Sequence, residues 1–249
     1  MKEKRSTANV RAAAGDIAGR VQRAEWERVS KDMNQSGWSL LPAMLKDEEC
    51  DALAGLYVEP EGFRSHIAMA HHGFGRGEYK YFSYPLPDIV ADLRTALYPK
   101  LVPIANLWNE RMATNVRFPE SHAAFIERCH AAGQIRPTPL LLQYGPEDYN
   151  CLHQDLYGAQ VFPMQVVFLL SEPEKDFTGG EFILTEQRPR MQSKAEVVPL
   201  RRGDAAVFAV HHRPHQGARG YYRVNLRHGV SKLRSGHRHT MGILFHDAA

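Results

Sequence analysis

The second half of the chain consists of short apolar runs separated by turn residues, and this pattern restricts the possible folds more than any other feature. Seven runs follow one another, at residues 140–144, 161–170, 181–185, 195–200, 205–210, 221–230 and 239–245. The sequences between them include glycine-rich or proline-containing turns at residues 145–148, 176–180, 202–204 and 216–220. Closely spaced short strands of this kind are typical of jelly rolls and barrels. We therefore expect residues 138–249 to form an all-β core.

The first half of the chain reads mainly as helix. Apolar residues at helical spacing between Val10 and Met33 predict one amphipathic cover helix. Further helices are expected at residues 45–57, 86–112 and 120–132, with Pro99 and Pro103 interrupting the second of these. Short strands are expected at residues 38–42 and 79–84. Helices that precede a β core pack on its outside, which predicts a single α+β domain at residues 37–249, with helical support from 37–137 and a helical extension at 1–36.

Composition excludes several classes of protein. The 249 residues carry 43% hydrophobic residues and a net charge of +3, which suits an ordinary globular enzyme. The longest apolar run, residues 161–170, is far shorter than the roughly 18 residues that a membrane span needs. The three cysteines are unpatterned, and no secretory signal is visible, so we expect a cytoplasmic protein without a disulfide framework.

Basic residues are concentrated near the C-terminus. Between residues 197 and 239 the chain has nine arginines and lysines against a single acid, Asp204. Such a window could bind nucleic acid or another polyanion. Strand alternation would send about half of these charges to each face of a sheet, so an ordinary solvated surface is the alternative.

Three residues form a candidate metal site. His153 and Asp155 are two positions apart, and on an extended strand both side chains leave the same face. His228 lies in a later run whose alternation directs it to the apolar side. Two histidines and one carboxylate are the ligand set of non-heme iron enzymes, which leaves coordination positions open for other molecules. A hydrogen-bonded core histidine and a surface polar pair remain the simpler reading of these residues.

Two other features bear on the same site. Arg238, ten residues after His228, is within plausible reach of a molecule bound at the metal. His211, His212 and His215 form an alternative cluster that could supply the distant ligand or a separate zinc site. Pro214 makes that segment look like a loop.

The spacing of His228, Val230, Leu233, Gly236 and Arg238 resembles the signature of iron(II)/2-oxoglutarate-dependent oxygenases of the prolyl-hydroxylase type. Upstream segments agree with that superfamily in order, over roughly residues 37–247: the His153-x-Asp155 pair, the Gly-Gly-Glu sequence at 179–181 and the Gly-Asp-x-x-x-Phe sequence at 203–208. The LHQDLYG sequence and the run to Asp247 also look like a bacterial oxygenase family described as acting on damaged DNA.

The resemblance implies a double-stranded β-helix with His153, Asp155 and His228 as Fe(II) ligands. It further implies that Arg238 binds the C5 carboxylate of 2-oxoglutarate, and that Tyr144 matches a tyrosine that hydrogen-bonds this cosubstrate in AlkB-type relatives. The implied reaction consumes O2, decarboxylates 2-oxoglutarate to succinate and hydroxylates a substrate C–H bond. A guanidinium suits this carboxylate because it can donate two parallel hydrogen bonds.

The identity of the primary substrate stays open in the sequence. AlkB-type demethylases carry a second arginine six positions beyond the first, whereas Leu244 stands there in this chain. Modified or damaged nucleic acid, a protein side chain and a small molecule are all compatible with the oxygenase reaction. A cupin-like zinc hydrolase and a non-catalytic barrel that binds nucleic acid are the alternatives from other classes.

Overall fold

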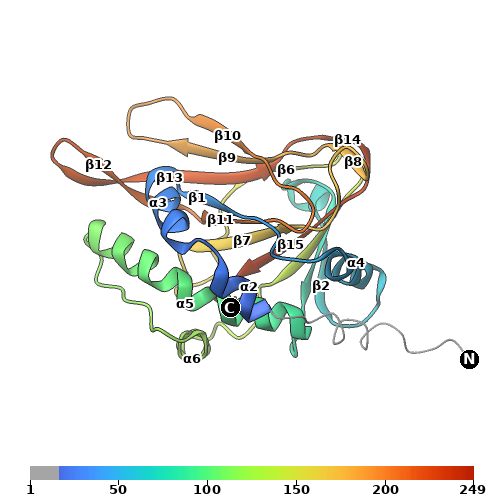
Figure 1. The fold of residues 1–249 in the computed structure, drawn as a ribbon, viewed down its shortest axis with the longest axis horizontal. Coiled ribbons are helices and arrows are strands. Elements are labelled where there is room, and N and C mark those ends of the chain that lie inside the picture. The colour runs from blue at the N-terminus through green and yellow to red at the C-terminus, as the bar shows by residue number, and fades with distance from the viewer. Residues whose placement is uncertain (1–16) are drawn as a thin grey trace, which may run out of the picture.

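The structure is a computed structural model that describes residues 17–249. Three layers lie one above another in Figure 1: a smaller sheet, a larger sheet, and helices beneath the larger sheet. The larger sheet has seven strands, in the order β1 (Trp38–Leu41), β11 (Ala205–Ala209), β7 (Met164–Leu169), β15 (Arg238–Leu244), β5 (Leu140–Tyr144), β4 (Glu78–Phe82) and β2 (Phe63–Ala68). Each strand is antiparallel to its neighbours.

The smaller sheet carries the candidate histidines. Its order is β10 (Lys194–Val198), β9 (Phe182–Gln187), β13 (Gly220–Val230), β6 (Tyr149–His153) and β3 (Gly75–Arg76), and β12 (His212–Gly217) forms a hairpin with β13. A separate strand pair consists of β8 (Phe177–Gly179) and β14 (Leu233–Gly236). The α+β class and the predicted strands are confirmed. The prediction of a loop at Pro214 is wrong, because β12 pairs with β13 through this segment at the edge of the sheet.

The helices are α2 (Ile17–Arg23), α3 (Trp26–Ser36), α4 (Asp47–Gly55), α5 (Asp88–Arg111) and α6 (His122–Ala131), with short 3-10 turns η1 (Leu56–Val58) and η2 (Met69–His72). The predicted single helix from Val10 to Met33 is wrong within the described residues, since α2 and α3 are separate helices there. The Trp26 indole Nε1 donates a 2.7 Å hydrogen bond to the Val21 carbonyl oxygen at the junction. Val10 and Ala13 lie outside the described residues.

The two prolines do not interrupt α5, contrary to the prediction. Each proline costs a helix interior about 3 kcal/mol. The helix runs beneath the larger sheet (Figure 1) and buries Leu97, Leu101 and Trp108 completely. Burial of one such side chain contributes about 1.5–3 kcal/mol, so several together outweigh the prolines. Within residues 17–249, no helix is long and apolar enough to cross a membrane.

Arg94 ties α5 to the end of the chain. Its Nε donates to the Leu244 carbonyl oxygen at 2.9 Å, and its Nη2 donates to Asp247 Oδ1 at 2.8 Å. Both partners are buried, which makes the pair costly to break. Since Leu244 ends β15, this contact holds the strand that begins with Arg238.

The larger sheet separates two apolar clusters. One face packs on the helices through residues such as Leu141, Val166 and Met241. The opposite face packs on the smaller sheet through Leu169 and Phe208, which meet Phe182 and Leu184. The candidate site lies between the two sheets.

Candidate metal and cosubstrate site

The three predicted metal ligands come together. His153 ends β6 and pairs with His228 on β13, which brings their ring centroids to 4.1 Å. Asp155 lies two residues beyond the end of β6, with Oδ2 3.3 Å from His228 Nε2 and Oδ1 3.5 Å from His153 Nε2. One donor atom from each residue lies within 4.8 Å of the others, and among the described residues no other such group of three forms. The donors fit a two-histidine, one-carboxylate metal centre.

Hydrogen bonds orient two of these ligands. His153 Nδ1 lies 2.7 Å from the Cys151 carbonyl oxygen, so Nδ1 carries the proton and leaves Nε2 free to ligate. Tyr157 Oη donates a 2.8 Å hydrogen bond to Asp155 Oδ1. Sequence reasoning missed Tyr157, although it stands only two residues beyond Asp155. Tyr157 can reach Asp155 only because the chain bends after β6.

The electrostatics keep the ligands in their metal-binding forms. Burial raises the pKa of the Asp155 carboxyl, but the contact with His228 and the charge of His153 lower it more, so the net pKa lies well below the usual range. Burial lowers the pKa of His228. An ionised carboxylate and a neutral imidazole are the forms that bind a divalent metal.

Gln165 is a further polar residue at the site. Its Nε2 lies 3.0 Å from His228 Nε2, and it is 4% exposed on β7. The amide of Gln165 therefore contacts the His228 nitrogen that also faces Asp155. In the sequence, Gln165 stands out as the single amide side chain within the apolar run at residues 161–170.

Arg238 and Tyr144 also meet. They are cross-strand partners on β15 and β5, with the guanidinium carbon 5.5 Å from the tyrosine ring centroid. Arg238 is 2% exposed, and within residues 17–249 its Nε and Nη1 contact no hydrogen-bond partner. Burial lowers the pKa of Arg238 to about 10. A buried cation with free donors is costly unless an anion binds it, so the arginine fits a carboxylate ligand.

One cavity of about 760 Å³ connects these two places. The cavity is lined by the three candidate ligands His153, Asp155 and His228, by Gln165, and by Arg238 and Tyr144. A cavity of this size can hold two small molecules at once.

The histidine cluster at residues 211–215 does not form a three-ligand group in the described chain. His211 and His212 rings lie 4.4 Å apart, but His215 packs on Tyr222 instead. The separate zinc site is therefore not supported. It is His228 that the strand pairing places beside His153.

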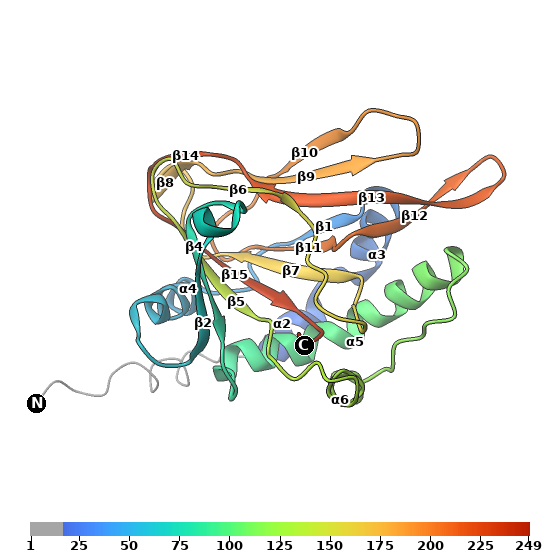
Figure 2. The same ribbon diagram turned by 180° about the vertical axis from the view of Figure 1, so that it is seen from behind.

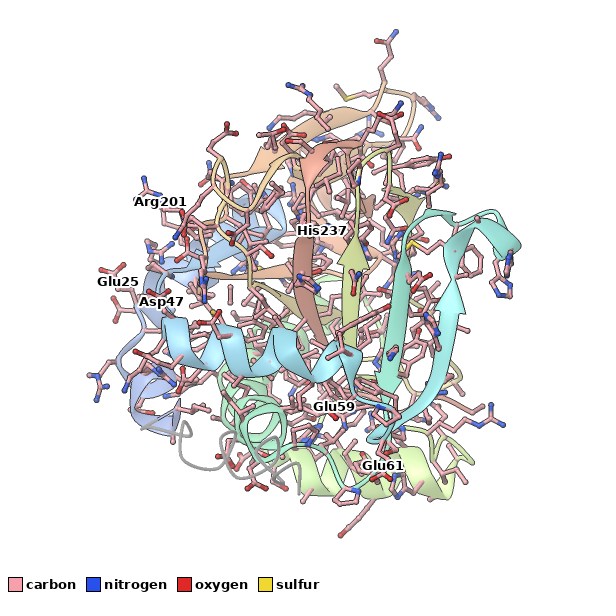
Figure 3. The ribbon with its side chains drawn as sticks, turned by 90° about the vertical axis from the view of Figure 1, so that its right-hand side faces the viewer. Glu25, Asp47, Glu59, Glu61, Arg201 and His237 are labelled. Carbon is pink, nitrogen blue, oxygen red and sulfur yellow. The ribbon has the colours of Figure 1, made fainter. Side chains whose placement is uncertain are left out.

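The basic window is divided among several environments. Arg213 is buried against Glu186, Arg202 pairs with Asp51, and Arg238 lies in the cavity. Arg201 and His237 lie on a face that also presents Asp47, Glu59 and Glu61 (Figure 3). The nine charges therefore do not form one basic surface.

Comparisons with known proteins agree with this site. Residues 77–248 match the model of the Oxygenase-NA family, described as an oxygenase catalysing oxidative methylation of damaged DNA. The chain belongs to this family. It is also 50% identical over 168 residues to an uncharacterized protein of Mycobacterium tuberculosis, which covers 68% of this chain and 72% of that protein.

Two solved structures are similar to this chain in fold. A prolyl-4-hydroxylase of Pseudomonas putida is similar with a TM-score of 0.54 at 15% identity, over 90% of this chain and 99% of that one. A 2OG-Fe(II) oxygenase family oxidoreductase of Burkholderia pseudomallei gives a TM-score of 0.51 at 15% identity, over 91% and 94%. The predicted oxygenase class is thus confirmed by the family match, and the fold is similar to that of a 2OG-Fe(II) oxygenase.

Proposed function

We propose that this oxygenase holds Fe(II) through His153, Asp155 and His228 and binds the C5 carboxylate of 2-oxoglutarate through Arg238, beside Tyr144. The observation that carries the proposal is that a three-donor group and a buried arginine with free donors share one cavity. The charges support it as well. The carboxylate of Asp155 can bind a metal cation, and the guanidinium of Arg238 can bind a carboxylate. We also infer that the two facing sheets form a double-stranded β-helix, within one catalytic unit at residues 37–249.

The residues of the chain orient the reactants. When bound, iron and 2-oxoglutarate supply the oxidative decarboxylation with O2 that yields succinate and hydroxylates a substrate C–H bond. Arg238 fixes one end of the cosubstrate, and Asp155 and the histidines fix the metal at the other end. The apolar side chains of Phe182 and Phe208 line the cavity between the sheets and exclude water.

We propose a modified or damaged nucleic acid as the primary substrate. The description of the family supports this choice. The cavity supports it as well, because an aromatic wall and two further arginines, Arg64 and Arg136, also line it.

The reaction is tested by succinate release that depends on both iron and 2-oxoglutarate. We expect His153→Ala or Asp155→Ala to abolish it, and Arg238→Ala to raise the KM for 2-oxoglutarate about 10- to 100-fold, as the loss of a charged hydrogen bond predicts. His215→Gln, on the edge strand β12, is the matched control and should leave succinate release unchanged. Unchanged iron-dependent turnover in the Asp155→Ala protein would contradict the assignment.

The substrate is tested by comparing how far candidate molecules stimulate succinate release. Methylated single-stranded DNA, peptides and small metabolites should be assayed at equal concentration. We expect stimulation by the DNA. Stimulation by a peptide alone would reject a nucleic-acid substrate and leave the reaction assignment intact.

A further inference from the structure

The cavity has an aromatic wall on β4, two strands away from β15 in the larger sheet (Figure 2). Tyr79 pairs with Leu142 and Tyr81 pairs with Leu140 on β5, and all four side chains line the cavity. The two tyrosine rings lie 5.4 Å apart, edge to face. The wall therefore presents aromatic surface to whatever enters beside the metal site.

A β-bulge adds a cation to this wall. On β2, Phe63 pairs with Phe82 and Ser65 pairs with the adjacent Tyr81, so Arg64 is the extra residue between them. A bulge redirects the side chain of the extra residue. The Arg64 guanidinium carbon lies 4.3 Å from the Tyr81 ring centroid, and its Nε donates a 2.8 Å hydrogen bond to the Pro137 carbonyl oxygen.

Arg136 lines the same part of the cavity. Within residues 17–249, neither Arg64 nor Arg136 has a carboxylate within ion-pair distance. Burial lowers the pKa of Arg64; Tyr81 opposes this effect, and the charge of Arg136 adds to it. The charge of Asp247 also acts on Arg64, but Asp247 forms its ion pair with Arg94. Two neighbouring guanidinium groups that form no ion pair can bind an oxyanion.

Two exposed apolar side chains also line the cavity. Phe74 and Leu152 line it and remain 49% and 46% exposed. They lie on adjacent segments, because β3 pairs with β6 and the Cys151 N–H donates to the Phe74 carbonyl oxygen. Gly75 on β3 allows a backbone approach that any Cβ would block. Exposed apolar side chains beside a cavity mark a binding surface.

We propose that Arg64, Arg136, Tyr79 and Tyr81 form the subsite for a single unpaired nucleotide, with its base against the tyrosines and its phosphate on the arginines. The inference rests on the proposed function and names the residues that bind the substrate. Tyr81 is buried, so a base that is stacked in a duplex cannot reach it, and the base enters unstacked from its neighbours. Phe74 and Leu152 then contact the nucleotides on either side.

The subsite adjoins the metal ligands. Tyr81 Oη donates to Tyr157 Oη at 3.0 Å, and Tyr157 Oη donates to Asp155 Oδ1 at 2.8 Å. A base against Tyr81 therefore lies beside the residues that hold the iron. A carboxylate on a small aromatic molecule is the other source of an oxyanion attached to a ring, and the experiment separates the two.

The test uses the full chain with Fe(II) and 2-oxoglutarate under anaerobic conditions, and a short single strand of DNA that contains one 2-aminopurine. We expect strand affinity to fall about tenfold or more in Arg64→Gln and in Arg136→Gln, with a salt dependence reduced by about 0.7 per lost phosphate contact. Arg227→Gln changes an exposed arginine on β13 and should bind as the wild type does. Arg64→Lys keeps the charge and controls for folding.

The contact between the base and the tyrosines is measured separately, by fluorescence. We expect 2-aminopurine fluorescence to be quenched on binding, and this quenching to be lost in Tyr79→Leu while the strand still binds. Equal affinity of the Gln variants and the wild type would overturn the subsite, as would equal weakening by Arg227→Gln. Displacement of the strand by a nucleoside monophosphate supports it, whereas displacement by an aromatic carboxylate alone overturns it.

The two proposals fail in different ways. A wild-type protein that releases succinate but does not bind the strand would overturn the nucleotide subsite and leave the reaction standing. Succinate release that survives Asp155→Ala would overturn the reaction, whatever the strand does.

Discussion

At the scale of single residues, Tyr157 affects the candidate metal site through one hydrogen bond. Its Oη donates to the Asp155 oxygen that lies 3.5 Å from His153, while the other oxygen faces His228. A carboxylate held in this way loses rotational freedom before a metal binds. Residues that fix a metal ligand typically contribute 10- to 100-fold to metal affinity.

We therefore predict that Tyr157→Phe weakens metal binding about 10- to 100-fold, because Asp155 loses its only tyrosine donor among the described residues. Co(II) binding, followed by its visible absorption without oxygen, measures this directly and does not depend on turnover. Tyr221→Phe changes an exposed tyrosine on β13 and is the matched control. Unchanged Co(II) affinity in Tyr157→Phe would mean that the bond is structural only.

At the scale of elements, the turn between β14 and β15 sets the position of Arg238. Gly236 has φ 79°, and an added Cβ would overlap the Asp176 carbonyl oxygen. Gly236 also pairs with Phe177, whose ring lies 5.9 Å from the Arg238 guanidinium carbon. The glycine two residues before Arg238 therefore has a steric cause.

We predict that Gly236→Ala lowers the free energy of unfolding by more than the cost of backbone strain, about 1–3 kcal/mol, because the added Cβ also overlaps the Asp176 carbonyl oxygen. The variant should also bind 2-oxoglutarate more weakly. Gly133→Ala is a close control, since Gly133 has φ 81° but nothing lies within 4 Å of an added Cβ. Urea unfolding gives the stability and calorimetry gives the affinity. Equal losses in the two variants would show that the φ angle alone matters and that the contact with Asp176 does not.

At the scale of the whole molecule, buried histidines link stability to pH. Burial, with the charge of Arg94, lowers the pKa of His122 and of His246 to about 4 in each case. In the unfolded chain these groups titrate near 6.5. The unfolded state therefore binds more protons between these values, so stability is complete above about pH 6.5 and falls as the pH drops toward 4.

We predict a loss of about 2 kcal/mol per histidine in the free energy of unfolding between pH 7 and pH 5. His122→Gln should flatten the pH dependence by one such contribution, because glutamine can still donate to the Phe245 carbonyl oxygen that His122 contacts at 2.9 Å. Urea unfolding at several pH values measures this. An equally steep curve in the variant would exclude His122 as a cause.

The sequence by itself determined the strand pattern of the second half and the inward direction of His228. It also determined the spacing that brings Arg238 into the same cavity. These features are local, because strand alternation and a glycine turn act over a few residues. The resemblance to a known superfamily added the chemistry, and the family match agrees with it.

Only the tertiary structure decided which residues support that chemistry. Tyr157 meets Tyr81 across 76 positions, and Gln165 meets His228 across 63. A bulge on β2 turns Arg64 toward the cavity, and burial keeps α5 intact through two prolines. These outcomes depend on packing between segments that are distant in the sequence. A local sequence pattern does not report the free energy of such contacts.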